Sequence, residues 1–200
     1  MSKARLEAFS DGVIAILIPI MVLELKAPLG NHWSSLEPVV PYLLTYILSY
    51  VFLGIYWNNH HHLLQLTDRV NGTILWANLH LLFWLSLVPF TTSWMGANGF
   101  ESLPTAAYGV VLLGAALAFL ILERAIIAQQ GARSRLAAAV GNELKGKISA
   151  ALYAIAIPAA FFQRAVAGSL YVLIALMWLV PDRRIERAIR AEEQTATKRH

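Results

Sequence analysis

Asp11 is the residue of this sequence whose chemistry is hardest to explain by packing alone. It follows Ser10 at the start of a long apolar run from Val13 to Leu23. A carboxylate about one turn inside a membrane helix costs roughly 2.5–3.5 kcal/mol on insertion scales, so it needs a partner and must face protein or water. Because such groups mark ion and proton pathways, Asp11 is the first candidate functional residue.

Three consecutive histidines, His60, His61 and His62, form a second group with chemical potential. Imidazole is a common metal ligand. Successive residues of a helix point about 100° apart, however, so three neighbours of one chain cannot converge on one ion without a partner chain. The stronger interpretation is that one histidine faces the helix bundle while the others reach the membrane interface. We therefore predict no resident metal here.

A stripe of apolar residues lies on the same helix as Asp11. Ile16, Ile20 and Leu23 are spaced i, i+4, i+7, which puts them on one helix face. Such a stripe either packs on neighbouring helices or lines a pore, where an apolar constriction controls ion passage by excluding water. The spacing alone leaves both interpretations open.

The composition indicates the environment of these residues. Of the 200 residues 58% are hydrophobic and 14% charged, against about 25% charged in an ordinary soluble domain. The balance is typical of an integral membrane protein. There is no cysteine, which excludes disulfides and thiolate chemistry. The net charge of +4 comes from basic residues at the edges of apolar segments, a pattern of membrane orientation rather than of nucleic-acid binding.

Six apolar segments are long enough to span a bilayer, which predicts an all-α integral membrane protein. They lie at about 6–26, 38–64, 72–95, 104–129, 147–163 and 165–181. With the N-terminus inside, only Lys26 and Arg164 of the basic residues lie outside. We expect a six-helix transmembrane domain over residues 1–181, a basic cytoplasmic tail over residues 182–200, and both termini on the cytoplasmic side of the cell membrane.

The first apolar segment also carries a motif. Arg5, Phe9, Ser10 and Asp11 form the pattern RxxxFSD, and the segment closes with VLELKAP. This combination resembles the first helix of the TMEM175 family of potassium channels. A weaker likeness continues downstream in a tryptophan and histidine pair and in an NL…PFT pattern: Trp57, His60, Asn78, Leu79, Pro89, Phe90 and Thr91.

The resemblance implies a function and an assembly. It implies a potassium channel formed by a homotetramer in which the first helix lines the pore, as in bacterial members with one six-helix unit per chain. One helix per chain cannot surround a pore, so several copies are needed. Carried onto this sequence, the constriction falls at Ile16, Ile20 and Leu23.

One position departs from the family pattern. Family members commonly have a threonine, implicated in favouring potassium over sodium, where this chain has Pro19. Proline removes an amide hydrogen and leaves the carbonyl of Ala15 without its usual donor. We expect this carbonyl, which lies next to the pore, to take over part of the role of the missing hydroxyl in potassium selectivity.

Polar residues near the inner ends of three helices form a predicted structural network that orients the pore helix. The start of the first helix and the end of the second lie on the same side, so Arg5, Asp11 and His60 are expected to meet there. Buried charges are tolerated only when paired. The proposed members are Arg5, Phe9, Ser10, Asp11, Trp57, His60 and Asn78.

Other classes of function are weighed against a channel. A proton-coupled carrier using Asp11 and His60 as a relay is the main alternative, and a non-conducting structural membrane protein is the third. An enzyme is disfavoured because no Walker loop, HExxH or GxSxG motif is present. No TVGYG filter occurs either, so selectivity must come from side chains or locally freed carbonyls. We expect no cofactor beyond permeant K+ ions, and as partners only the bilayer and further copies of the chain.

Overall fold

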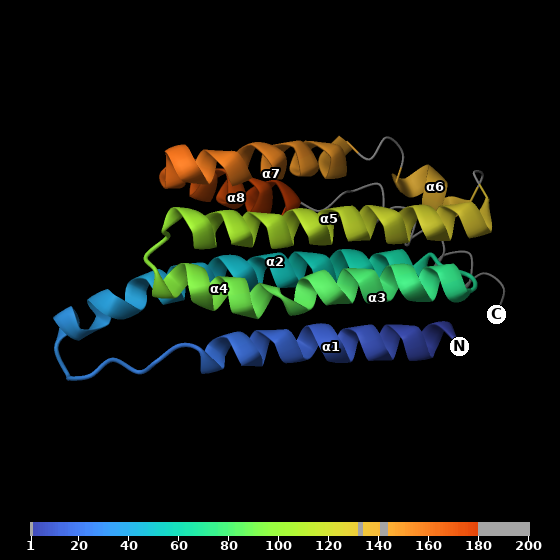
Figure 1. Cartoon of the computed structure of the whole chain (residues 1–200). Helices are drawn as coiled ribbons and strands as arrows, with labels where there is room; N and C mark the ends of the chain where they lie inside the picture. The colour runs from blue at the N-terminus through green and yellow to red at the C-terminus, as the bar shows by residue number, and fades with distance from the viewer. Residues whose placement is uncertain (1, 132–133, 141–143, 180–200) are drawn as a thin grey trace.

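Every regular element in the described part of the chain is helical. The computed structural model describes residues 2–131, 134–140 and 144–179, and its long helices lie side by side in one bundle (Figure 1). The all-α prediction is confirmed. In order the elements are α1 (Lys3–Leu23), the 3-10 helix η1 (Trp33–Val39), α2 (Val40–Gln65), α3 (Gly72–Ser86), α4 (Val88–Ala97), α5 (Ser102–Gln130), α6 (Arg135–Val140), α7 (Leu144–Phe162) and α8 (Arg164–Leu179).

Five segments of the described chain are long and apolar enough to cross a membrane: α1, η1 with α2, α3 with α4, α5, and α7. The helix α8 is apolar but has 16 residues, which is just below the usual length of a span. The chain is therefore a multi-pass membrane protein. The end of the sixth predicted segment and the predicted tail, residues 182–200, lie outside the described residues.

The third predicted helix, 72–95, is one span but two helices, because the structure interrupts it at Leu87. Pro89 lies in the first turn of α4, where its missing amide hydrogen costs little, and it cannot continue the hydrogen-bond ladder of α3. The hydroxyl of Thr91 donates to the carbonyl of Leu87, and that of Thr92 donates to the carbonyl of Val88. The amide of Thr91 bonds to the same carbonyl of Leu87, so these hydroxyls add hydrogen bonds within the first turn of α4.

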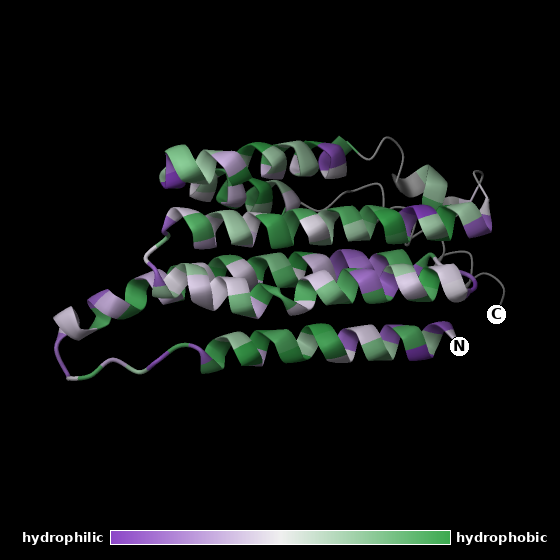
Figure 2. Cartoon of the chain, in the orientation of Figure 1, coloured by the Kyte–Doolittle hydropathy of each residue, from purple (hydrophilic) through white to green (hydrophobic). Residues whose placement is uncertain are grey.

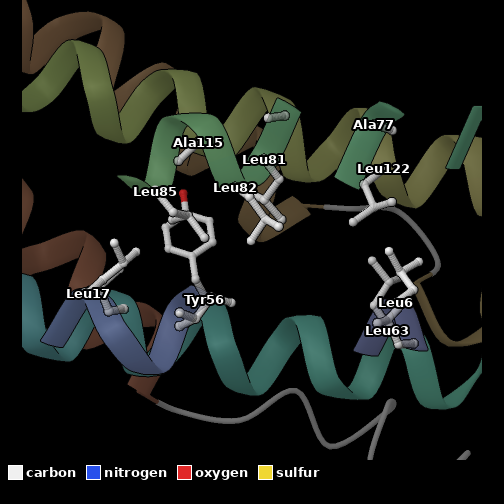
Figure 3. Close-up of a cluster of buried hydrophobic side chains, with 14 of the residues drawn as sticks. Leu6, Leu17, Tyr56, Leu63, Ala77, Leu81, Leu82, Leu85, Ala115 and Leu122 are labelled. Atoms are coloured by element: carbon white, nitrogen blue, oxygen red, sulfur yellow. The ribbon is translucent and has the colours of Figure 1, made fainter. Parts of the chain in front are cut away.

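Two clusters of buried apolar side chains hold the bundle together. The first joins α1, α2, α3 and α5 and also includes Val88 of α4 and Leu136 of α6. Figure 3 shows Leu6 of α1 beside Leu63 of α2, and Leu17 of α1 on the side of Tyr56 and Leu85. The second joins α2, α4, α5, α7 and α8 and contains three fully buried tyrosines, Tyr108, Tyr153 and Tyr171. Only the first cluster includes α1.

Two glycines allow the helices to approach closely. A Cβ atom on Gly96 of α4 would lie 2.9 Å from the Cα atom of Tyr42 on α2. A Cβ atom on Gly114 of α5 would lie 2.3 Å from the ring of Trp84 on α3. Because dispersion contacts drive helix association in membranes, such small residues let α2, α3, α4 and α5 form the rigid body on which α1 rests.

Candidate functional site

The helix α1 lies at the edge of the bundle (Figure 1), where it contacts α2, α3 and α4. Its buried residues recur every three or four positions, as expected of one helix face packed on a protein surface. The opposite face has no covering element in the described chain. The buried residues are Leu6, Ser10, Ile14, Leu17 and Met21.

The predicted pore stripe lies on the uncovered face. Ile16 is 59% exposed, Ile20 41% and Leu23 81%. Ala15 and Pro19 are exposed beside them. These residues therefore do not pack on the described helices of their own chain, which leaves lipid, another copy of the chain or a pore as their surroundings.

A chain of three buried polar side chains holds the opposite face. The hydroxyl of Ser10 donates to the carbonyl of Leu6 at 2.9 Å, so it accepts from Nδ2 of Asn78, also at 2.9 Å. The carbonyl oxygen of Asn78 then faces His60, whose Nε2 lies 2.7 Å away and donates to it. All three side chains have 0% exposure, and they join α1, α3 and α2. The bond between Ser10 and Asn78 forms only when Ser10 points toward α3. These buried hydrogen bonds therefore fix the rotation of α1 about its own axis.

A second, half-exposed set of polar contacts lies along the α1–α2 edge. The indole of Trp57 donates to Asp11 Oδ1 at 3.1 Å. Nδ1 of His61 lies 3.2 Å from Glu7 Oε1, and the His61 ring stacks on Trp57 with centroids 6.0 Å apart. Lys3 donates to the carbonyl of Gln65 at 2.8 Å. Figure 2 shows that the hydrophilic residues of α1, α2 and α3 gather toward the end of the bundle that holds the N-terminus.

The polar residues expected to form one network are therefore divided in two. Asp11 contacts Trp57, whereas His60 contacts Asn78. Ser10 and Asp11 are consecutive on a helix, so only one of them can face the interior. The two residues of the hypothetical proton relay, Asp11 and His60, share no hydrogen bond.

Arg5 and Phe9 lie on the uncovered face of α1 and take no part in either set. Phe9 is 51% exposed. The guanidinium of Arg5 has no hydrogen bond or ion pair with any residue that the structure describes. The expected meeting of Arg5 with Asp11 and His60 is therefore absent from the described residues, because Arg5 precedes Ser10 by five positions, which turns it about 140° around the helix from the buried Ser10.

Two contacts of α1 were missed by reasoning from the sequence. Glu7 precedes Asp11 by four residues, so the same face carries both carboxylates, and that spacing could have identified the Glu7–His61 pair. The hydroxyl of Ser93 on α4 donates to Glu24 Oε2 at 3.0 Å, and no local pattern indicates this pair. Together these contacts hold α1 to the bundle at both ends.

His60 and His61 have different partners. His60 is buried against Asn78, while His61 faces Glu7. Among the residues that the structure describes, no group of three histidine, cysteine, aspartate or glutamate side chains could hold a metal ion.

The fold defines a multi-pass α-helical membrane protein. Buried hydrogen bonds among Ser10, Asn78 and His60 hold one face of α1, and its opposite, apolar face is left uncovered. The family model described as the endosomal/lysosomal potassium channel TMEM175 matches residues 5–89. A potassium channel of Chryseobacterium sp. (strain P1-3) is 53% identical over 190 residues, which cover 95% of this chain and 99% of that one. The chain belongs to the TMEM175 family, whose members are ion channels and not enzymes.

Two further relatives extend the comparison. The crystal structure of a lysosomal potassium-selective channel TMEM175 homolog from Chamaesiphon minutus matches with a TM-score of 0.77 at 25% identity, covering 90% of this chain and 97% of that chain. The endosomal/lysosomal proton channel TMEM175 of Danio rerio is 26% identical over 135 residues, 65% of this chain and 25% of that protein. Both potassium and proton channels are thus named among the relatives.

Proposed function

We propose that this chain is a potassium channel whose pore lies on the axis of a homotetramer, lined by one α1 from each copy and constricted at Ile16, Ile20 and Leu23. The observation that carries the proposal is the uncovered apolar face of α1, opposite a face fixed by buried hydrogen bonds. One helix cannot surround a pore, so the pore needs several copies around a symmetry axis. The 53% identity to a relative named as a potassium channel supports K+ as the ion.

Pro19 favours a pore over lipid as the surroundings of this face. Pro19 lies inside α1, and both Pro19 and Ala15 are exposed. The carbonyl of Ala15 has lost the amide that would normally bond to it. Because an unsatisfied backbone group in hydrocarbon costs several kcal/mol, such a carbonyl is tolerated at membrane depth where it is covered by protein or faces water.

The polar contacts of Ser10, Asp11, Trp57, His60 and Asn78 act as a structural anchor in this account. They lie toward the N-terminal end of α1, which the distribution of basic residues puts on the cytoplasmic side together with the C-terminus. Buried hydrogen bonds are costly to break, so the anchor holds Ile16 toward the axis rather than toward lipid. A carrier that passes protons directly between Asp11 and His60 is disfavoured, because the two side chains have different partners.

A bi-ionic measurement tests the function. Purified protein in planar bilayers, with K+ on one side and Na+ on the other, is expected to give a reversal potential displaced toward that of potassium. A reversal potential of zero would contradict potassium selectivity. Intact oligomers without current, or counterflow with a fixed proton stoichiometry, would contradict a channel.

In the same measurement Pro19→Thr is expected to raise the permeability of K+ relative to Na+ by about threefold, which corresponds to a barrier difference of about 0.7 kcal/mol. The substitution exchanges a freed carbonyl for a hydroxyl in the pore. Pro158→Thr, the same change inside α7, is the matched control and is expected to leave the ratio unchanged. An unchanged ratio in Pro19→Thr would show that this position does not contribute to selectivity.

A further inference from the structure

The 3-10 helix η1 stands outside the bundle, at the end opposite the N-terminus (Figure 1). The inner ends of α1 and α2 are level, because Lys3 donates to the carbonyl of Gln65. From that level α1, with 21 residues, rises about 32 Å. The 26 residues of α2 and the 7 residues of η1 together rise about 53 Å. Trp33, the first residue of η1, therefore lies about 20 Å beyond the outer end of α1.

Lipid does not cover this helix. The hydrocarbon core of a bilayer is about 30 Å thick, so α1 is about as long as the core and its ends lie near the two edges of the core. The headgroup region adds only about 5–8 Å on each side. A residue about 20 Å beyond α1 is thus past the headgroups, where its surroundings are water or protein.

η1 carries an apolar stripe that its own chain leaves open. Side chains three residues apart lie above one another on a 3-10 helix, so Trp33, Leu36 and Val39 share one face. Trp33 is 89% exposed and Leu36 42%, and η1 has no buried residue. Leu29, just before the helix, is 96% exposed. Large apolar side chains gathered on a surface in water mark a protein interface, where tryptophan is enriched.

Two opposite charges flank the stripe. Lys26 precedes it and Glu37 lies within η1, and both side chains are exposed. Neither side chain forms an ion pair with a residue that the structure describes. A surface with unpaired charges of both signs is complementary to a rotated copy of itself, since Lys26 of one copy can face Glu37 of the next.

From these observations, and resting on the proposed tetramer, we propose that residues 26–39 of each copy pack on the same segment of the next copy and form a collar around the outer mouth of the pore. The segment continues the uncovered face of α1, whose last residue, Leu23, is 81% exposed. It therefore begins where the copies meet in the proposed channel. In water the hydrophobic effect stabilises such a contact, whereas helix contacts inside lipid lack this contribution.

The stability of the tetramer tests the collar. Size-exclusion chromatography with light scattering gives the protein concentration at which half of the tetramer has dissociated in detergent. Trp33→Ser is expected to raise this concentration about tenfold, because a buried tryptophan is a typical energetic centre of an interface. Phe162→Ser is the matched control, since Phe162 is 90% exposed at the end of α7, and it is expected to leave the concentration unchanged.

A charge exchange tests the contact between copies without removing apolar area. Lys26→Glu and Glu37→Lys each place like charges together, so each is expected to raise the half-dissociation concentration about threefold in low salt. The double variant restores opposite charges and is expected to return to the wild-type value.

The outcomes separate the collar from the tetramer itself. A wild-type tetramer that Trp33→Ser leaves unchanged would overturn the collar while the proposed channel stands. The same result with weaker binding of Trp33→Ser to lipid vesicles would show that lipid covers η1, and it would also overturn the collar. A wild-type protein that is monomeric in detergent and in lipid nanodiscs would overturn both proposals.

Discussion

Ile16→Asn is expected to raise single-channel K+ conductance about tenfold and to bring the bi-ionic reversal potential close to zero. An apolar constriction resists ions because it excludes their water. An amide at this position holds water in the constriction, and a barrier lowered by about 1.4 kcal/mol gives a tenfold faster passage. Na+ gains with K+, since both ions then keep more of their hydration shell. Single-channel recordings of the purified protein measure both effects.

The control for this substitution is Val22→Asn on the same helix. Val22 is also exposed, but it lies six residues from Ile16, which places it about 120° around α1. It carries the same chemical change on another face, about 9 Å further along the helix, and its conductance is expected to remain within about twofold of the wild type. Equal effects of the two variants would show that Ile16 is not at the constriction.

Asn78→Leu is expected to destabilise the folded, assembled protein more than any surface change on the same helices. The amide of Asn78 bridges Ser10 and His60 in a fully buried position. Its removal leaves the Nε2–H group of His60 without an acceptor, at a cost of about 1–3 kcal/mol. The α1 helix then loses its contact with α3 at the anchor. The measurement is the fraction of oligomer that survives heating in detergent, followed by size-exclusion chromatography.

Two further variants distinguish the loss of buried hydrogen bonds from the loss of a polar side chain in general. Asn58→Leu makes the same change at an exposed position of α2 and is expected to keep the wild-type thermal stability. The double variant His60→Leu with Asn78→Leu removes both partners of the bond, so it is expected to be more stable than Asn78→Leu alone. A double variant less stable than either single variant would contradict the anchor.

The apolar segments were predictable because the thickness of the bilayer sets their length. Residues 104–129 as predicted and Ser102–Gln130 as found differ by only two residues at the start and one at the end. The break at Leu87 was missed because a proline in a membrane helix is compatible with a continuous or an interrupted helix, and the hydroxyls of Thr91 and Thr92 favour the interruption.

The members of the candidate site were easier to predict than their pairing. The types of Ser10, His60 and Asn78 mark them as buried polar groups that need partners. Which of them meet depends on the rotation of each helix about its axis, and a difference of one residue turns a side chain by about 100°. The contacts of Glu24 with Ser93 and of Asp11 with Trp57 join residues far apart in the sequence, so no local spacing indicates them.

The central claim, that the uncovered face of α1 borders water on the axis of the assembly, is tested most directly by thiol accessibility. The sequence contains no cysteine, so in the Ile20→Cys variant the reagent meets no other thiol in the protein. A thiol reacts as the thiolate, which forms in water and not in hydrocarbon. A charged thiol reagent is expected to modify Ile20→Cys and abolish its K+ current, while Val172→Cys on the exposed face of α8 stays unreactive and conducting. An unreactive Ile20→Cys in a conducting channel would contradict the account.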